Sequence, residues 1–263
     1  MKFALKNLVV AAAFVAAGAA NAADLTLTTG GSVTDQGWTV SGLTGSGTLS
    51  FSPLLLQALI AGSVQVDGVA PAVATIDGSL FDGVYNSVTA AAPITSLTGS
   101  FDGTTVTVGQ VATAGGALQT AYADDFTNTG GTLAITNLRV DLGAKIVYAD
   151  LDGGNGVGLK QNIALWNIAN ISGPTSFAAV EGTITSVNEL TGLSITSEAF
   201  GYFTQSLGII EGGLGVLASI TDYGSISSTI TVTATPAIPE PSTYALMGVG
   251  LLGVSLVARR RAK

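Results

Sequence analysis

Any catalysis by this chain would have to rest on carboxylates, because the 263 residues include no histidine and no cysteine. Ser-His-Asp, Cys-His and histidine-based zinc sites are therefore excluded. Two acids about 5 to 10 Å apart could still hydrolyse a glycosidic bond. Each candidate acid is more simply explained as a solvated residue on a loop or at a helix start, so the sequence predicts a protein that is not an enzyme. The candidates are Asp124, Asp125, Glu181, Glu189 and Glu198.

Oxygen ligands for calcium are the second chemistry that the residue types allow. Asp150, Asp152 and Asn155 resemble the opening of a calcium-binding loop, with acids at the first and third positions. An EF-hand also needs Asp or Asn at the fifth position and Glu at the twelfth, where this chain has Gly154 and Gln161. Calcium at this segment is therefore one hypothesis and an ordinary glycine-rich turn is the other. No other cofactor is expected.

The central part of the chain is strongly acidic. Six of the nine basic residues lie in the two ends of the chain, and sixteen of the seventeen acidic residues lie between them, which leaves this body a net charge of −13. The body has too few cations to neutralise phosphates, so nucleic acid is excluded as a partner. An acidic surface suits an extracellular protein that self-repulsion keeps soluble.

The N-terminal segment has the three parts of a secretory signal. Two lysines precede an apolar stretch from Leu8 to Ala20, and the small residues Ala20 and Ala22 form a cleavage site. Signal peptidase would leave Ala23 as the new N-terminus. The sequence therefore predicts export of the residues that follow.

The C-terminal segment combines an apolar run with a basic cluster. Residues 243–258 carry no charge, and a helix of that length spans about 24 Å, which can cross a bilayer that thins locally. Arg259, Arg260 and Arg261 follow at once and predict a cytoplasmic C-terminus. With a secretory signal in front, the body is expected on the outer side of the inner membrane.

The triplet Pro239-Glu240-Pro241, the apolar run and the three arginines together resemble a PEP-CTERM sorting signal. The resemblance covers only about a tenth of the chain, but this order of parts at the C-terminus is specific. It implies processing near the triplet by an exosortase, a membrane transpeptidase of Gram-negative bacteria that make exopolysaccharide. The protein would then be released or attached at the cell surface, with these residues acting as a substrate.

The body has the pattern of a mainly β fold. Apolar residues alternate with Thr or Ser, and five Asp-Gly pairs predict hairpin turns, so we expect an antiparallel β-sandwich or a related layered β domain. The expected strands include 25–28, 39–41, 47–51, 104–108, 132–142, 182–187 and 228–234, and the Asp-Gly pairs begin at 67, 77, 82, 102 and 152.

Two short helices are expected within this body. Ser52 caps a helix over about 53–61, and Thr196 caps another over about 197–207. Each follows a short strand, 144 residues apart, which suggests two similar halves or a coincidence of common local signals. Residues 193–208 are faintly similar to the end of HtaA-type surface domains, some of which bind haem, but no haem ligand is carried over because histidine is absent.

These observations favour an exported, exosortase-processed protein of the cell surface or extracellular matrix that is not catalytic and is associated with exopolysaccharide. The alternatives are a surface module that binds glycan or calcium and, less favoured, a carboxylate glycoside hydrolase. The expected segments are a signal peptide (1–22), a β-rich body (23–235) and a sorting tail (236–263) with its motif at 239–241, a transmembrane helix at 243–258 and basic residues at 259–263.

Overall fold

The computed structural model describes residues 23–237, 246–249 and 251. The described body is mainly antiparallel β-structure with short helices, as predicted. The strands are β1 Ala23–Thr28, β2 Ser32–Asp35, β3 Trp38–Phe51, β4 Val64–Val69, β5 Val73–Ser79, β6 Val84–Phe101, β7 Thr105–Thr113, β8 Gly116–Ala121, β9 Gly131–Asp141, β10 Ile146–Gly153, β11 Gly158–Ser172, β12 Ser176–Ala178, β13 Gly182–Ile195 and β14 Gly224–Pro236, and the helices are α1 Pro53–Ala61, α2 Ser197–Ser206 and α3 Glu211–Ser219.

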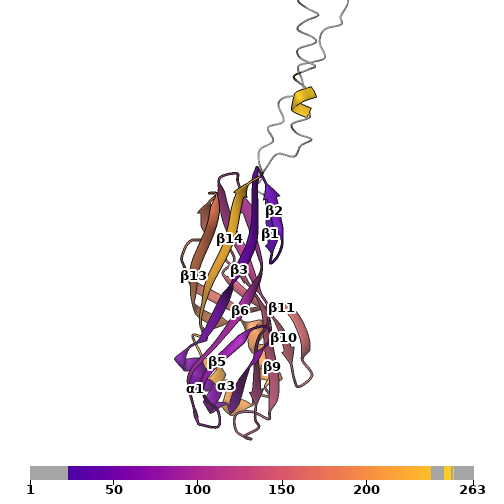
Figure 1. Cartoon of the computed structure of the whole chain (residues 1–263). Helices are drawn as coiled ribbons and strands as arrows, with labels where there is room; N and C mark the ends of the chain where they lie inside the picture. Colours follow the sequence, from indigo (N-terminus) through magenta and orange to yellow (C-terminus); the bar gives the residue numbers. More distant parts are fainter. Residues whose placement is uncertain (1–22, 238–245, 250, 252–263) are drawn as a thin grey trace, which may run out of the picture.

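The strands form one sheet that closes on itself, rather than the two packed sheets of a sandwich. Hydrogen bonding runs through β7, β6, β3, β14, β13, β11, β10 and β9, and β9 pairs back onto β7 through Gln110–Ala112 and Arg139–Asp141. Closure is possible because long strands change partners along their length. β6 pairs with β3 over its middle and with β1 over Ser96–Phe101. The result is an elongated ring of strands (Figure 1).

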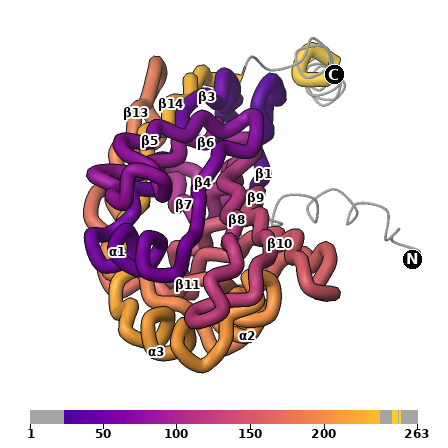
Figure 2. The backbone as a smooth tube through the Cα atoms, turned by 90° about the horizontal axis from the view of Figure 1, so that it is seen from below, coloured from indigo at the N-terminus to yellow at the C-terminus, as the bar shows by residue number. Residues whose placement is uncertain are grey.

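The two predicted helices are confirmed and leave the ring at the same end. β3 and β13 lie on either side of β14 and are both antiparallel to it, so α1 and α2, which follow them, start at the same edge. Ser52 Oγ accepts the N–H of Leu55, and Thr196 Oγ1 accepts that of Ala199, so both caps form as expected. Figure 2, seen from below, shows α1, α2 and α3 around this helical end.

A third helix, α3, was not predicted, and a further helical turn covers residues 246–249. Among the residues that the structure describes, no helix is both long enough and apolar enough to span a membrane. Most of the predicted transmembrane segment 243–258 lies outside the described residues.

The largest hydrophobic core lies toward the helical end of the ring. It brings together fully buried side chains of β10, β11 and β13 with Phe203 of α2 and Tyr223. A second, smaller cluster of Leu27, Leu43, Ile94 and Ile230 fills part of the opposite end. Side chains of both clusters line a cavity inside the ring.

Candidate functional site

The ring encloses a cavity of about 170 Å³. Inward-facing side chains of most strands line it, together with residues of α1 and α2, and most of them are apolar. Val40, Leu97, Val111 and Val232 point inward and yet are only half-buried. Native interiors are normally packed as densely as organic crystals, so this end of the ring is hollow.

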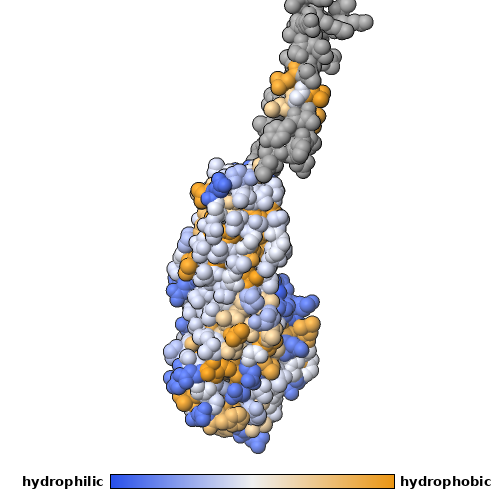
Figure 3. Space-filling view, in the orientation of Figure 1, coloured by the Kyte–Doolittle hydropathy of each residue, from blue (hydrophilic) through white to orange (hydrophobic). Residues whose placement is uncertain are grey.

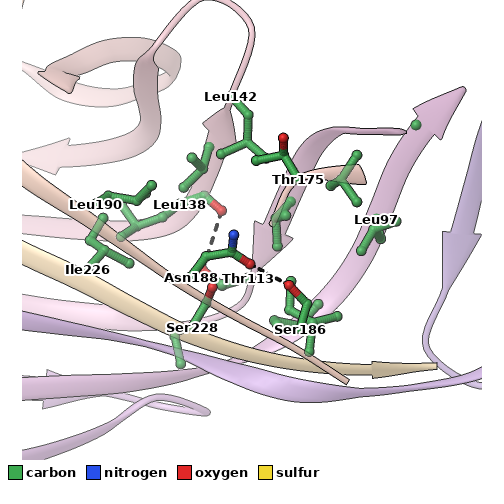
Figure 4. Close-up of a pocket in the computed structure, with 18 of the residues that line it drawn as sticks. Leu97, Thr113, Leu138, Leu142, Thr175, Ser186, Asn188, Leu190, Ile226 and Ser228 are labelled. Carbon is green, nitrogen blue, oxygen red and sulfur yellow. Dashed lines mark hydrogen bonds between the residues drawn. The ribbon is translucent and has the colours of Figure 1, made fainter. Parts of the chain in front are cut away.

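A small polar group lies on the wall of the cavity at mid-length. Ser186 Oγ donates to Asn188 Oδ1 over 2.5 Å, and Asn188 Nδ2 donates to the carbonyl of Pro174 over 2.9 Å. Both side chains are buried on β13. Figure 4 shows Ser186, Asn188 and Thr113 facing the same interior space. These bonds also tie the segment before β12 to β13, which closes the wall between β7 and β13.

Aromatic side chains form the floor of the cavity at the helical end. Trp166, Phe203 and Tyr223 all line it. The ring centroids of Trp166 and Tyr223 are 6.2 Å apart, and those of Phe203 and Tyr223 are 6.4 Å apart. Burial raises the pKa of Tyr223 far above its ordinary value, so the phenol stays neutral and can donate a hydrogen bond.

Two hydrogen-bonding groups in this floor have no partner among the described residues. They are Nε1 of Trp166, whose residue is 3% exposed, and the hydroxyl of Tyr223, whose residue is 1% exposed. An unpaired buried polar group costs about 1 to 3 kcal/mol, so such groups usually have a partner. Neither residue stands out in the sequence, because apolar and polar residues alternate in the same way whether the interior is filled or hollow.

The residues considered for calcium have different partners in the structure. Asp150 is buried and forms an ion pair with Arg139 (Oδ1 to Nη2, 2.6 Å), and it also accepts from Asn137 Nδ2. Asp152 is exposed. Asn155 donates from Nδ2 to the carbonyls of Gly130 and Ser206, at the turn after β10. Among the described residues, no group of three acids is placed to hold a metal ion.

Burial alone would raise the pKa of Asp150. The hydrogen bonds from Arg139, Asn137 and the Asn162 N–H outweigh burial, and the net pKa lies below the ordinary value of 3.8. The carboxylate is therefore held as an anion by protein donors. It acts as a cross-link between β9, β10 and β11.

The three candidate glutamates are spread along one strand. Glu181 precedes β13, Glu189 lies within it and Glu198 follows it in α2. A 14-residue strand spans about 45 Å. Glu181 and Glu198 are therefore at opposite ends of the ring, and Glu189 is more than about 20 Å from either. No two of these glutamates have the spacing of a glycosidase pair.

Asp124 and Asp125 lie in the loop between β8 and β9. The Asp124 carboxylate accepts from Thr127 Oγ1 and from the backbone N–H groups of Phe126, Thr127 and Asn128. These bonds, that of the Thr127 side chain first, hold the pKa of Asp124 well below its ordinary value. Asp124 thus shapes the loop, and Asp125 is exposed with a φ of +61°.

More exposed apolar surface is visible in the helical half of the body than in the half from which the chain termini leave (Figure 3). The exposed apolar side chains include Phe81, Tyr122 and Phe126, and the first two meet edge to face with ring centroids 5.7 Å apart. Both tryptophans, which are common in sugar sites, line the interior cavity instead. Phe81 and Tyr122 therefore form an exposed aromatic pair that is separate from both tryptophans.

The chain ends of the body leave the ring together, at the end opposite the helices (Figure 1). Ala23, the first residue of β1, pairs with Phe101, and Pro236, the last residue of β14, pairs with Trp38. The N–H of Ala237 then donates to the carbonyl of Gly37. A family model describing the PEP-CTERM protein-sorting motif matches residues 237–261.

The tail is a PEP-CTERM sorting motif. It begins at the residue that makes the last backbone hydrogen bond of the body. No curated protein and no solved structure matches the chain. The motif residues Pro239, Glu240 and Pro241 lie outside the described residues, as do the basic cluster Arg259–Arg261 and the predicted signal cleavage residues Ala20 and Ala22.

Proposed function

We propose that this exosortase-targeted surface protein is a non-catalytic component of the extracellular matrix, associated with exopolysaccharide. Its PEP-CTERM motif supports delivery by the exosortase route. The acidic body supports a soluble extracellular role, because like charges keep such proteins apart. Signal peptidase and exosortase are its proposed processing partners. The inner membrane holds the chain, with its C-terminus in the cytoplasm, until the tail is cut.

The position of the folded body between the two processing sites carries this proposal. The first residue of β1 is the residue expected after signal cleavage, and the last strand is paired up to Pro236. A cut near Glu240 would therefore remove no strand residue and no core side chain. Processing at both ends leaves the ring of strands complete.

Substitution of the motif tests the proposal. We expect the wild-type protein to lose its C-terminal segment and to reach the cell surface or medium. A variant with Pro239→Ala, Glu240→Ala and Pro241→Ala should keep the segment and stay in the inner-membrane fraction. Intact mass and cell fractionation measure both outcomes.

A Ser242→Ala variant beside the motif is the control and should be processed normally. A chain that stops after Ala237 should leave the membrane fraction, because it lacks the apolar run and the arginines. If the triple variant is cut at the same place as wild type, exosortase processing at the motif is wrong. If the shortened chain stays anchored in the inner membrane, the anchor is elsewhere.

We further propose that the body works without calcium. Asp150 is already paired with Arg139, and the side-chain amide of Asn155 donates hydrogen bonds to two carbonyls. Adding calcium or a chelator should therefore leave the melting temperature of the body unchanged. Calorimetry or circular dichroism measures this. A rise of more than about 2 °C with calcium, lost in Asp152→Ala, would support the alternative of a calcium-binding surface module.

A further inference from the structure

We propose that the cavity inside the ring of strands is a binding site for a linear, uncharged amphiphile: an alkyl chain that ends in a hydrogen-bond-accepting oxygen, as in a long-chain alcohol, ester or amide. The oxygen would lie at the aromatic floor, beside Trp166 and Tyr223. The alkyl chain would run along the inside of β14 toward the end from which the chain termini leave. This inference concerns the interior of the body and does not depend on how the tail is processed.

The lining of the cavity requires an apolar ligand. Leu27, Leu97, Val111, Ile230 and Val232 form its wall, and Asp35 is the one charged lining residue among those described. A cavity of about 150 Å³ with a comparable apolar lining holds benzene in another protein, and this cavity has about 170 Å³. A ligand would restore the van der Waals contacts that the half-buried wall residues lack.

The shape of the cavity favours a chain over a broad ring system. Alternate residues of β14 from Ile226 to Ala234 all line it, which corresponds to about 27 Å along the strand. The lining of the cavity is therefore elongated along β14. The apolar tail of the protein itself is a poor fit as a helix, because a helix with its side chains is about 10 Å wide.

The two unpaired donors define the polar end of the ligand. Trp166 Nε1 can only donate, and the neutral Tyr223 hydroxyl can donate or accept, so an oxygen acceptor that reached either group would give it a partner. Both residues line the floor, and their rings are 6.2 Å apart. A ligand oxygen here would supply the partner that the described protein atoms do not.

The charges around the cavity exclude an anionic headgroup. Arg139, Lys145 and Lys160 are the cations of the described body, and none of them lines the cavity. A carboxylate placed among these apolar walls would lose its hydration without gaining a counter-ion, which is costly. Asp35 at the opposite end adds repulsion. An alcohol, ester or amide avoids both penalties.

Photolabelling of the full chain, produced in membranes that lack exosortase so that the tail is kept, tests the proposal. The probes are a 1-decanol analogue and a decanoate analogue, each with a diazirine in its alkyl chain, and mass spectrometry maps the labelled peptides. We expect the alcohol to label peptides of β6 and β14 saturably. Labelling of the apolar tail, from probe dissolved in the bilayer, gives an internal reference in every sample.

A matched pair of variants on β14 separates cavity binding from surface labelling. Ser228 lines the cavity, whereas its neighbour Ser227 is exposed. Ser228→Phe should fill the space and lower labelling of the body at least tenfold. Ser227→Phe should leave it unchanged. In both variants the tail should be labelled as in wild type.

Tyr223→Phe provides a test that does not require adding volume to the interior. Loss of one hydrogen bond should raise the concentration of alcohol needed for half-maximal labelling about fivefold. It should not impair folding, because the hydroxyl has no partner among the described residues. Absent labelling of the body, equal labelling in Ser228→Phe and Ser227→Phe, or equal labelling by decanoate and decanol would each overturn the proposal.

Discussion

Gly224→Ala is expected to lower the free energy of unfolding by about 3 kcal/mol or more, the largest effect we anticipate for a single added methyl group. Gly224 has a φ of +133°, where residues with a side chain are strained. A Cβ added there would lie 1.9 Å from the carbonyl oxygen of Ser50. That oxygen belongs to β3, the neighbour of β14, so the clash can be relieved only by moving a strand of the ring.

The helix residue Gly201 is the control for this substitution. A Cβ at Gly201 in α2 would meet nothing within 4 Å. Gly201→Ala should therefore raise the stability by about 0.5 to 1 kcal/mol through the better helix propensity of alanine. Urea denaturation monitored by circular dichroism measures both variants. If Gly224→Ala proves as stable as wild type, β14 does not pass as close to β3 at Gly224 as the structure shows.

Asp150→Ala is expected to cost about 3 kcal/mol at neutral pH. The substitution leaves Arg139 without its ion-pair partner, and it removes the acceptor of the Asn162 N–H (3.0 Å). Asp152→Ala, two residues away and exposed, should change stability by less than about 0.5 kcal/mol. Denaturation of the two variants at the same pH gives the comparison directly.

The cost of Asp150→Ala should also depend on pH. The pKa of Asp150 in the folded protein lies below its ordinary value of 3.8, so the folded state favours the anion. This contribution is fully present above the ordinary pKa and is lost as the pH falls through the folded-state pKa. The difference between wild type and Asp150→Ala should therefore be constant from pH 7 to about pH 5 and shrink in stronger acid. A difference that grows on acidification would contradict the assigned sign.

Local signals predicted the elements that depend on local chemistry. The cap at Ser52 and the proline after it placed α1 at its observed residues, 53–61. α3 was missed because its segment contains three glycines, which disfavour a helix in isolation. Two of those glycines are needed for packing: a Cβ on Gly212 would lie 2.4 Å from the carbonyl oxygen of Phe126, and one on Gly213 would lie 2.2 Å from that of Thr127. Backbone-to-backbone contact with a distant loop is not visible in a helix pattern.

Closure of the sheet could not be predicted from alternation. The same period of two occurs in the strands of a sandwich and of a closed ring. The two folds differ in whether the strands at the two edges of the sheet pair with each other. Here closure depends on three residue pairs between β7 and β9. The candidate calcium residues were chosen in the same way, by their spacing along the chain, which does not show their partners on other strands. Asp150 forms its ion pair with Arg139, which lies on the neighbouring strand β9.

Because both ends of the body leave the ring on the side opposite the helices, the anchored protein has a fixed polarity. Only six residues separate Pro236 from the apolar run at Thr243, so the tether reaches at most about 25 Å. The end of the ring where Trp38 pairs with Pro236, opposite the helices and the aromatic floor, is therefore held close to the bilayer surface before processing. The 18 residues of β6 extend away from it over as much as about 60 Å. Until exosortase cuts the tail, the end of the cavity that Asp35 and Trp38 line would thus lie nearer the lipid than the aromatic floor does.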